Sequence, residues 1–139
     1  MPHIHDKIDF TVEVFVVHKN KVLLRKHDKY KKWLSVGGHI ELDEDPNQAA
    51  TREVKEEVGL EVKLLGSFPF FHERDYTELI PPVALNRHRI KENHEHLTLV
   101  YFASSKTDAL NPSRKEVSKE LKWFTKDSKN YLSGKMLGG

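Results

Sequence analysis

Apolar and polar residues alternate along the first part of the chain. Phe10, Val12, Val14 and Val16 recur at every second position, which is the period of a strand with one buried face. The pattern breaks at residues 19–21, Lys-Asn-Lys, and a second apolar run follows. Two β-rich runs joined by so short a polar segment predict a β-hairpin.

Residues 45–58 change to a helical pattern. Asp45 suits the N-cap, Pro46 the first helical position, and Gln48 the third, where it completes a capping box. Gly59 is a C-terminal stop signal. An apolar stripe that would hold the helix on a sheet has the same period, namely Ala50, Val54 and Val58.

The remaining segments are mostly strand-like. We predict strands around Trp33–Ser35, within 60–71, over 96–104 and up to Phe124, a loop over 72–86, and a terminal helix that begins near 126–127. This order is typical of an α+β protein, an α/β/α sandwich in which a mixed sheet carries a helix on each face. A length of 139 residues fits one domain over 1–139.

Composition excludes several kinds of protein. The net charge of +2 gives no electrostatic argument for nucleic acid or membrane as a partner. The absence of cysteine excludes disulfides, thiol nucleophiles and thiolate metal sites. No apolar stretch approaches the roughly 20 residues of a membrane span, and the N-terminus lacks the apolar region of a secretory signal. We therefore expect a cytoplasmic protein.

Acidic residues gather on one face of the predicted helix. Glu53, Glu56 and Glu57 are spaced by three and four positions, so their side chains project together. Such a run is ordinarily a solvated helix face. Like charges at this spacing destabilise a helix by a few tenths of a kcal/mol each, and a divalent cation would remove that repulsion. Carboxylate oxygens are the ligands that Mg²⁺ prefers.

The spacing around this acidic face is that of a known motif. From Gly38 to Leu60 the chain follows G-x5-E-x7-R-E-V-x-E-E-x-G-L, with Glu44 as the first acidic position. This segment resembles the complete box of the Nudix hydrolase superfamily, and the chain length resembles MutT-like single-domain members. Val36 stands where many members have proline before the two glycines. The resemblance implies the Nudix-type α/β/α fold.

The resemblance also implies an activity and a set of ligands. Nudix enzymes use Mg²⁺ or Mn²⁺ to hydrolyse a nucleoside diphosphate linked to another moiety, such as a (d)NTP or a dinucleotide polyphosphate. Glu53 and Glu57 would be the main metal ligands, and Glu56 would support the metals or their waters. The carbonyl of Gly37 or Gly38 could also ligate, because glycine lets the backbone approach closely.

Two further roles depend on residues around the helix. Arg52 would pair with Glu44 or a helix carboxylate and so hold the ligands in place. For the general base we favour Glu95, just before the buried strand at 96–104. The alternatives are Glu92, His94, His96 and a box glutamate. His3 and His5 are interpreted as incidental.

The sequence leaves the substrate and the assembly open. A tyrosine after the box, Tyr76, resembles the diadenosine polyphosphate hydrolases. A Nudix-fold domain that binds a nucleotide without turnover is the alternative, and the intact glutamates argue against it. An isopentenyl-diphosphate isomerase relative would be expected to use a cysteine, and the chain has none. The expected partner is a nucleotide derivative, and the oligomeric state is open, a homodimer included.

Overall fold

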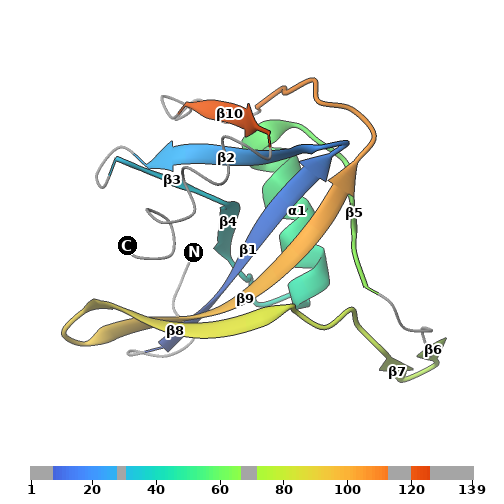
Figure 1. Cartoon of the computed structure of the whole chain (residues 1–139). Helices are drawn as coiled ribbons and strands as arrows, with labels where there is room; N and C mark the ends of the chain where they lie inside the picture. The colour runs from blue at the N-terminus through green and yellow to red at the C-terminus, as the bar shows by residue number, and fades with distance from the viewer. Residues whose placement is uncertain (1–7, 28–30, 67–71, 113–119, 126–139) are drawn as a thin grey trace.

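The computed structural model describes residues 8–27, 31–66, 72–112 and 120–125. Its elements in chain order are β1 (Ile8–His18), β2 (Lys21–His27), β3 (Lys32–Leu34), β4 (Val36–His39), α1 (Pro46–Val58), β5 (Val62–Leu64), β6 (His72–Glu73), β7 (Tyr76–Thr77), β8 (Ala84–Lys91), β9 (His94–Ser105) and β10 (Leu121–Phe124). Figure 1 shows how one sheet and one helix account for most of them.

The main sheet is mixed. Its central path is β10-β2-β1-β9-β5, and β3, β4 and β8 pair with β2, β1 and β9 respectively. The two long central strands, β1 and β9, run parallel and lie side by side (Figure 1). The β1–β2 hairpin predicted around residues 19–21 is confirmed. The parallel pairing brings two segments almost ninety residues apart into register, with Asp9 opposite His96.

Helix α1 covers one face of this sheet, as predicted. Asp45 accepts a hydrogen bond from the Gln48 N–H, and the Gln48 side chain accepts one from the Asp45 N–H, which completes the capping box. Gly59 ends the helix at a φ of 77°, where glycine is strongly favoured. The buried apolar stripe packs with the inward residues of the first strand in a single core, which includes Ala50, Val54, Val58, Val12, Val14 and Val16.

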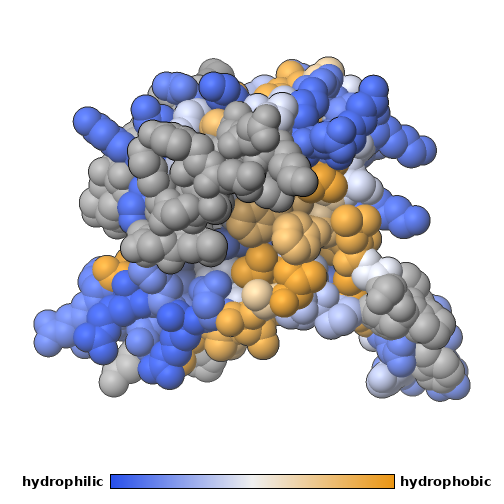
Figure 2. All heavy atoms as spheres, in the orientation of Figure 1, coloured by the Kyte–Doolittle hydropathy of each residue, from blue (hydrophilic) through white to orange (hydrophobic). Residues whose placement is uncertain are grey.

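The opposite face of the sheet carries a second, smaller core of Val22, Leu24 and Phe124. Apolar residues gather near the middle of the view in Figure 2, with hydrophilic residues at its upper right and lower left. Within the described ranges α1 is the only helix. The helix predicted from residues 126–127 for this second face lies outside the described residues.

Strand β8 differs from the sequence prediction. The loop expected over 72–86 contains the short β6–β7 hairpin, and β8 extends from Ala84 to Lys91 along β9. Every residue of β8 is exposed, so neither face needed apolar side chains. The sequence therefore lacks the alternation of apolar and polar residues that predicts a strand. In the described part of the chain, no helix combines the length and the apolarity needed to cross a membrane.

Candidate active site

Gly38, which precedes α1, lets one helix carboxylate approach the sheet closely. Strand β4 pairs with β1, with Gly38 opposite Val12. A Cβ atom on Gly38 would overlap the carboxylate of Glu53. Glu53 is only 5% exposed, although it belongs to the charged face of the helix. The absence of a side chain at Gly38 therefore creates the space that a buried carboxylate occupies.

Arg52 connects the carboxylates to this strand. Its guanidinium donates to both Glu44 oxygens, from Nε at 2.9 Å and from Nη2 at 2.7 Å. Nη2 also donates to the His39 carbonyl at 3.0 Å. Nη1 lies 3.1 Å from a Glu53 oxygen and 3.4 Å from a Glu56 oxygen. One side chain thus fixes the loop, the strand and two residues of the acidic face.

The same contacts change the acid–base properties of the pair. Hydrogen bonds from Arg52 hold the pKa of Glu44 below its usual value, against a smaller opposing effect of burial. The carboxylate of Glu44 raises the pKa of Arg52 further above its already high value. Both groups therefore stay charged through the physiological range, and the planar fork of Arg52 keeps a defined orientation.

Glu57 faces a second arginine. Its Oε2 lies 3.7 Å from Nε of Arg25, which also donates to the Ser35 carbonyl at 2.8 Å. Arg25 comes from β2, so the acidic face is bordered by cations from two different elements. Glu57 is mostly buried, whereas Glu56 is the most exposed of the three glutamates.

Comparison with known proteins identifies the family of this chain. The family model described as "NUDIX domain" matches residues 8–132. A crystal structure of a NUDIX-family hydrolase from Clostridium perfringens is 36% identical, with a TM-score of 0.77, over 88% of this chain and 85% of that one. The chain belongs to the Nudix family of hydrolases.

Two MutT structures share the fold at lower identity. The MutT protein from Bacillus halodurans is 19% identical, with a TM-score of 0.62, over 89% of this chain and 72% of that one. The MutT NUDIX hydrolase from Burkholderia pseudomallei is 20% identical, with the same TM-score, over 88% and 86%. The Nudix-type α+β fold expected from the sequence is therefore confirmed.

The candidate base Glu95 lies apart from the Nudix carboxylates in this structure. It stands opposite Ile8 on β1, whereas Gly38 stands opposite Val12. Four strand residues correspond to about 13 Å along the strand. The Glu95 carboxylate pairs with Nη2 of Arg87 at 2.8 Å across the β8–β9 ribbon.

The other candidate bases separate by position. Glu92 is exposed at the β8–β9 turn, whereas His94 is buried at the start of β9 and His96 is partly buried. His94 and His96 face Asp9 of β1, and their donor atoms lie within 4.8 Å of one another. Sequence reasoning did not connect Asp9 or His39 with any site. The position of His39 directly after the two glycines was the available signal.

Proposed function

We propose that this Nudix hydrolase cleaves a phosphoanhydride bond in a nucleoside diphosphate linked to another moiety, with Mg²⁺ or Mn²⁺ as cofactor. The observation that carries the proposal is the position of the three glutamates: Glu53 lies beside Gly38, Arg52 contacts both Glu53 and Glu56, and Glu57 lies one helical turn after Glu53 near Arg25. A cluster of anionic oxygens with arginines at its border suits a cation and the phosphates that it accompanies.

The donor set fits a hard divalent cation. All three side chains offer carboxylate oxygens, the ligand type of Mg²⁺ and Mn²⁺. The Gly37 carbonyl is a further candidate ligand. Carbonyl groups two residues apart in a strand point the same way, and the His39 carbonyl points to Arg52. Glu53 and Glu57 would hold the metal, and Glu56 would support it or its waters.

The protein groups then have separable tasks. When bound, the metal would neutralise phosphate charge and make its coordinated water a better nucleophile. Arg52 keeps Glu53 and Glu56 in position through its contacts at 3.1 and 3.4 Å. Arg25, close to Glu57, is placed to contact a substrate phosphate.

A glutamate accepts the proton of the attacking water. Glu56, with 37% of its side chain exposed, has the best solvent access of the box glutamates. Glu95 is the alternative base, and it would have to leave its pairing with Arg87. A comparison of Glu56→Gln with Glu95→Gln decides between them. Loss of the acidic limb of the pH–rate profile identifies the base.

The central test measures product release from a panel of nucleoside diphosphate derivatives with Mg²⁺, Mn²⁺ or a chelator. We expect metal-dependent turnover in the wild type and a loss of about 10³-fold in Glu57→Gln, since a metal ligand contributes several kcal/mol to the transition state. Glu61→Gln is the matched control, because Glu61 is 86% exposed just beyond the helix. Full turnover in Glu57→Gln would refute the ligand assignment.

The panel also tests the competing function. A nucleotide-binding domain without turnover would bind members of the panel and release no product from any of them. The intact arrangement of three glutamates and Arg52 favours the enzyme, because binding alone does not need a positioned water. The cytoplasm, which holds nucleotides and Mg²⁺, is the location that fits this proposal.

A further inference from the structure

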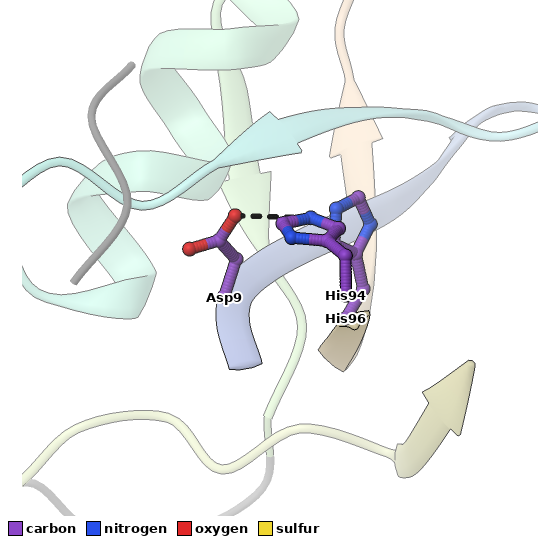
Figure 3. Close-up of side chains that lie close together, drawn as sticks. All are labelled: Asp9, His94 and His96. Carbon is purple, nitrogen blue, oxygen red and sulfur yellow. Dashed lines mark ion pairs between the residues drawn. The ribbon is translucent and has the colours of Figure 1, made fainter. Parts of the chain in front are cut away.

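A second group of potential metal ligands lies on the face of the sheet opposite α1. Asp9 of β1 and His94 and His96 of β9 project to the same side of their strands and toward one another (Figure 3). The parallel register explains this, because it places Asp9 directly opposite His96 and leaves His94 two positions away on the same face. None of these residues belongs to the Nudix box.

His39 adds a third imidazole from a third strand. It stands opposite Thr11 on β1, and therefore shares the face of Asp9. Its Nε2 lies 3.6 Å from Oδ2 of Asp9, and its ring centroid lies 5.0 Å from that of His96. We call Asp9, His39, His94 and His96 the histidine cluster.

Distances within the histidine cluster suit a small coordination sphere. Nε2 of His94 lies 3.2 Å from the same Asp9 oxygen that His39 approaches. Metal–ligand bonds of 2.0–2.2 Å place neighbouring corners of a tetrahedron about 3.3–3.6 Å apart. The two His–Asp distances fall near this range, and a donor nitrogen of His96 lies within 4.8 Å of the ligand atoms of Asp9 and His94.

Burial and ligand type both suit a bound metal ion at the histidine cluster. Asp9 is 2% exposed and His94 is 8% exposed, so an ion held there would be largely shielded from solvent. Three imidazoles around one carboxylate are the donors of zinc-class metals, whereas Mg²⁺ prefers oxygen alone.

We propose that the histidine cluster is a second metal site, which binds one divalent transition metal of the zinc class through Asp9, His94, His96 and His39. The site is distinct from the Mg²⁺ carboxylates and does not depend on the proposed hydrolase activity. Its ligands come from β1, β4 and β9, so a bound ion cross-links three strands. It also fixes His39, whose carbonyl accepts from Arg52 on the other face. The role of the ion is therefore structural: it stabilises the strands next to Gly37 and Gly38.

Metal uptake by the full chain tests the proposal directly. The protein is stripped with a chelator, returned to excess Mg²⁺ to occupy the carboxylates, and titrated with Zn²⁺ or Co²⁺. We expect one equivalent of tight Zn²⁺ binding, an intense visible Co²⁺ spectrum typical of tetrahedral coordination, and a higher Tm with Zn²⁺. His96→Asn and His94→Asn should each weaken Zn²⁺ binding by more than about 100-fold, beyond the effect of losing a residue that only supports a ligand.

Three variants separate this site from other sources of binding. His72→Asn removes an exposed histidine of the β6–β7 hairpin and should retain uptake. Glu57→Gln should retain uptake as well, because it alters only the carboxylates. A double variant, His3→Asn with His5→Asn, removes the two terminal histidines and should also bind one equivalent. Melting curves without metal establish that the His94 and His96 variants are folded.

Two outcomes would overturn the proposal. The first is a wild type that takes up no stoichiometric Zn²⁺ or Co²⁺ in the presence of Mg²⁺, which would make the cluster a hydrogen-bonded network between histidines and Asp9. The second is Zn²⁺ uptake that is lost in the double variant of His3 and His5 but is unchanged in folded His94→Asn and His96→Asn.

Discussion

The two faces of β4 present opposite chemistry to the rest of the molecule. On one face, Gly38 leaves space for the Glu53 carboxylate of α1, which Arg52 contacts at 3.1 Å. His39, the next residue, contributes to the other face, where imidazoles surround the buried Asp9. The first arrangement suits a hard ion such as Mg²⁺, whose water and phosphate ligands exchange. The second suits a zinc-class ion that remains bound as part of the structure. Adjacent residues of one strand can thus serve two functions, because their side chains alternate.

The largest expected effect comes from substituting, one at a time, the three glutamates on the acidic face of α1. Glu53→Gln should reduce kcat by about 10³-fold or more, Glu57→Gln by a similar factor, and Glu56→Gln by less, in the order of their burial. None should change Zn²⁺ uptake, which is the readout of the other face. Steady-state kinetics beside Zn²⁺ titration checks both. A series in which Zn²⁺ uptake falls together with kcat would show that the two faces are one site.

Substitutions of two neighbouring glycines should distinguish an effect on catalysis from an effect on folding. A Cβ on Gly38 would meet the Glu53 carboxylate, whereas a Cβ on Gly37 would meet the backbone carbonyl of Val12. Gly38→Ala should therefore displace a ligand and reduce kcat strongly with modest loss of stability. Gly37→Ala should instead force strands apart and cost about 1–3 kcal/mol, the usual range for overpacking.

Denaturant unfolding and kinetics on both glycine variants distinguish these outcomes. Equal loss of stability in the two would mean that the Glu53 carboxylate cannot move aside, and the space at Gly38 would then be structural. Equal and full activity in both would show that neither contact matters to the bound metal.

Arg52 provides an effect of intermediate size. Arg52→Lys keeps the charge but loses the planar fork that joins Glu44 to the His39 carbonyl. We expect Mg²⁺ affinity or kcat to fall about 10- to 100-fold, as for other residues that orient ligands. A Mg²⁺ titration of turnover measures it, with Lys55→Arg on the exposed side of α1 as the control. Unchanged kinetics in Arg52→Lys would show that charge alone is sufficient there.

The two faces also differ in how far sequence alone could predict them. The glutamates and Arg52 of the proposed carboxylate site all lie within residues 44–57, so helical spacing and the resemblance to the Nudix box were enough to predict them, whereas the approach of Arg25 from β2 was not predicted. The histidine cluster depends on the register of β1 against β9, which pairs Asp9 with a residue 87 positions away. Register is set by the packing of the assembled sheet and not by a local signal. Strand β8 was missed for a different reason, because all its residues are exposed and its sequence shows no apolar alternation.

The smallest expected effect concerns the stability contribution of Glu13, which lies on the same face of the sheet as the histidine cluster. Glu13 is partly buried there, and burial raises its pKa, against a hydrogen bond from Ser35 and the nearby charges of Arg25 and His88. The folded state therefore holds the Glu13 proton more tightly than the unfolded chain does. The contribution of Glu13 to stability should fall as pH rises from the usual value of 4.5 through the raised pKa. Glu13→Gln has no such charge to bury, so it should raise Tm by about 1–3 °C at pH 7.

Melting curves of Glu13→Gln and wild type with a chelator, at pH 7 and near pH 4, isolate this contribution. The difference in Tm should disappear at the lower pH, where the carboxyl of the wild type is already protonated. Glu61→Gln should show no comparable gain, because its side chain is almost fully exposed. A Glu13→Gln protein that melts below wild type at pH 7 would mean that the contacts with Ser35 and Arg25 outweigh burial. Ser35 and the charges near Glu13 would then be sufficient to stabilise its carboxylate inside the sheet without protonation.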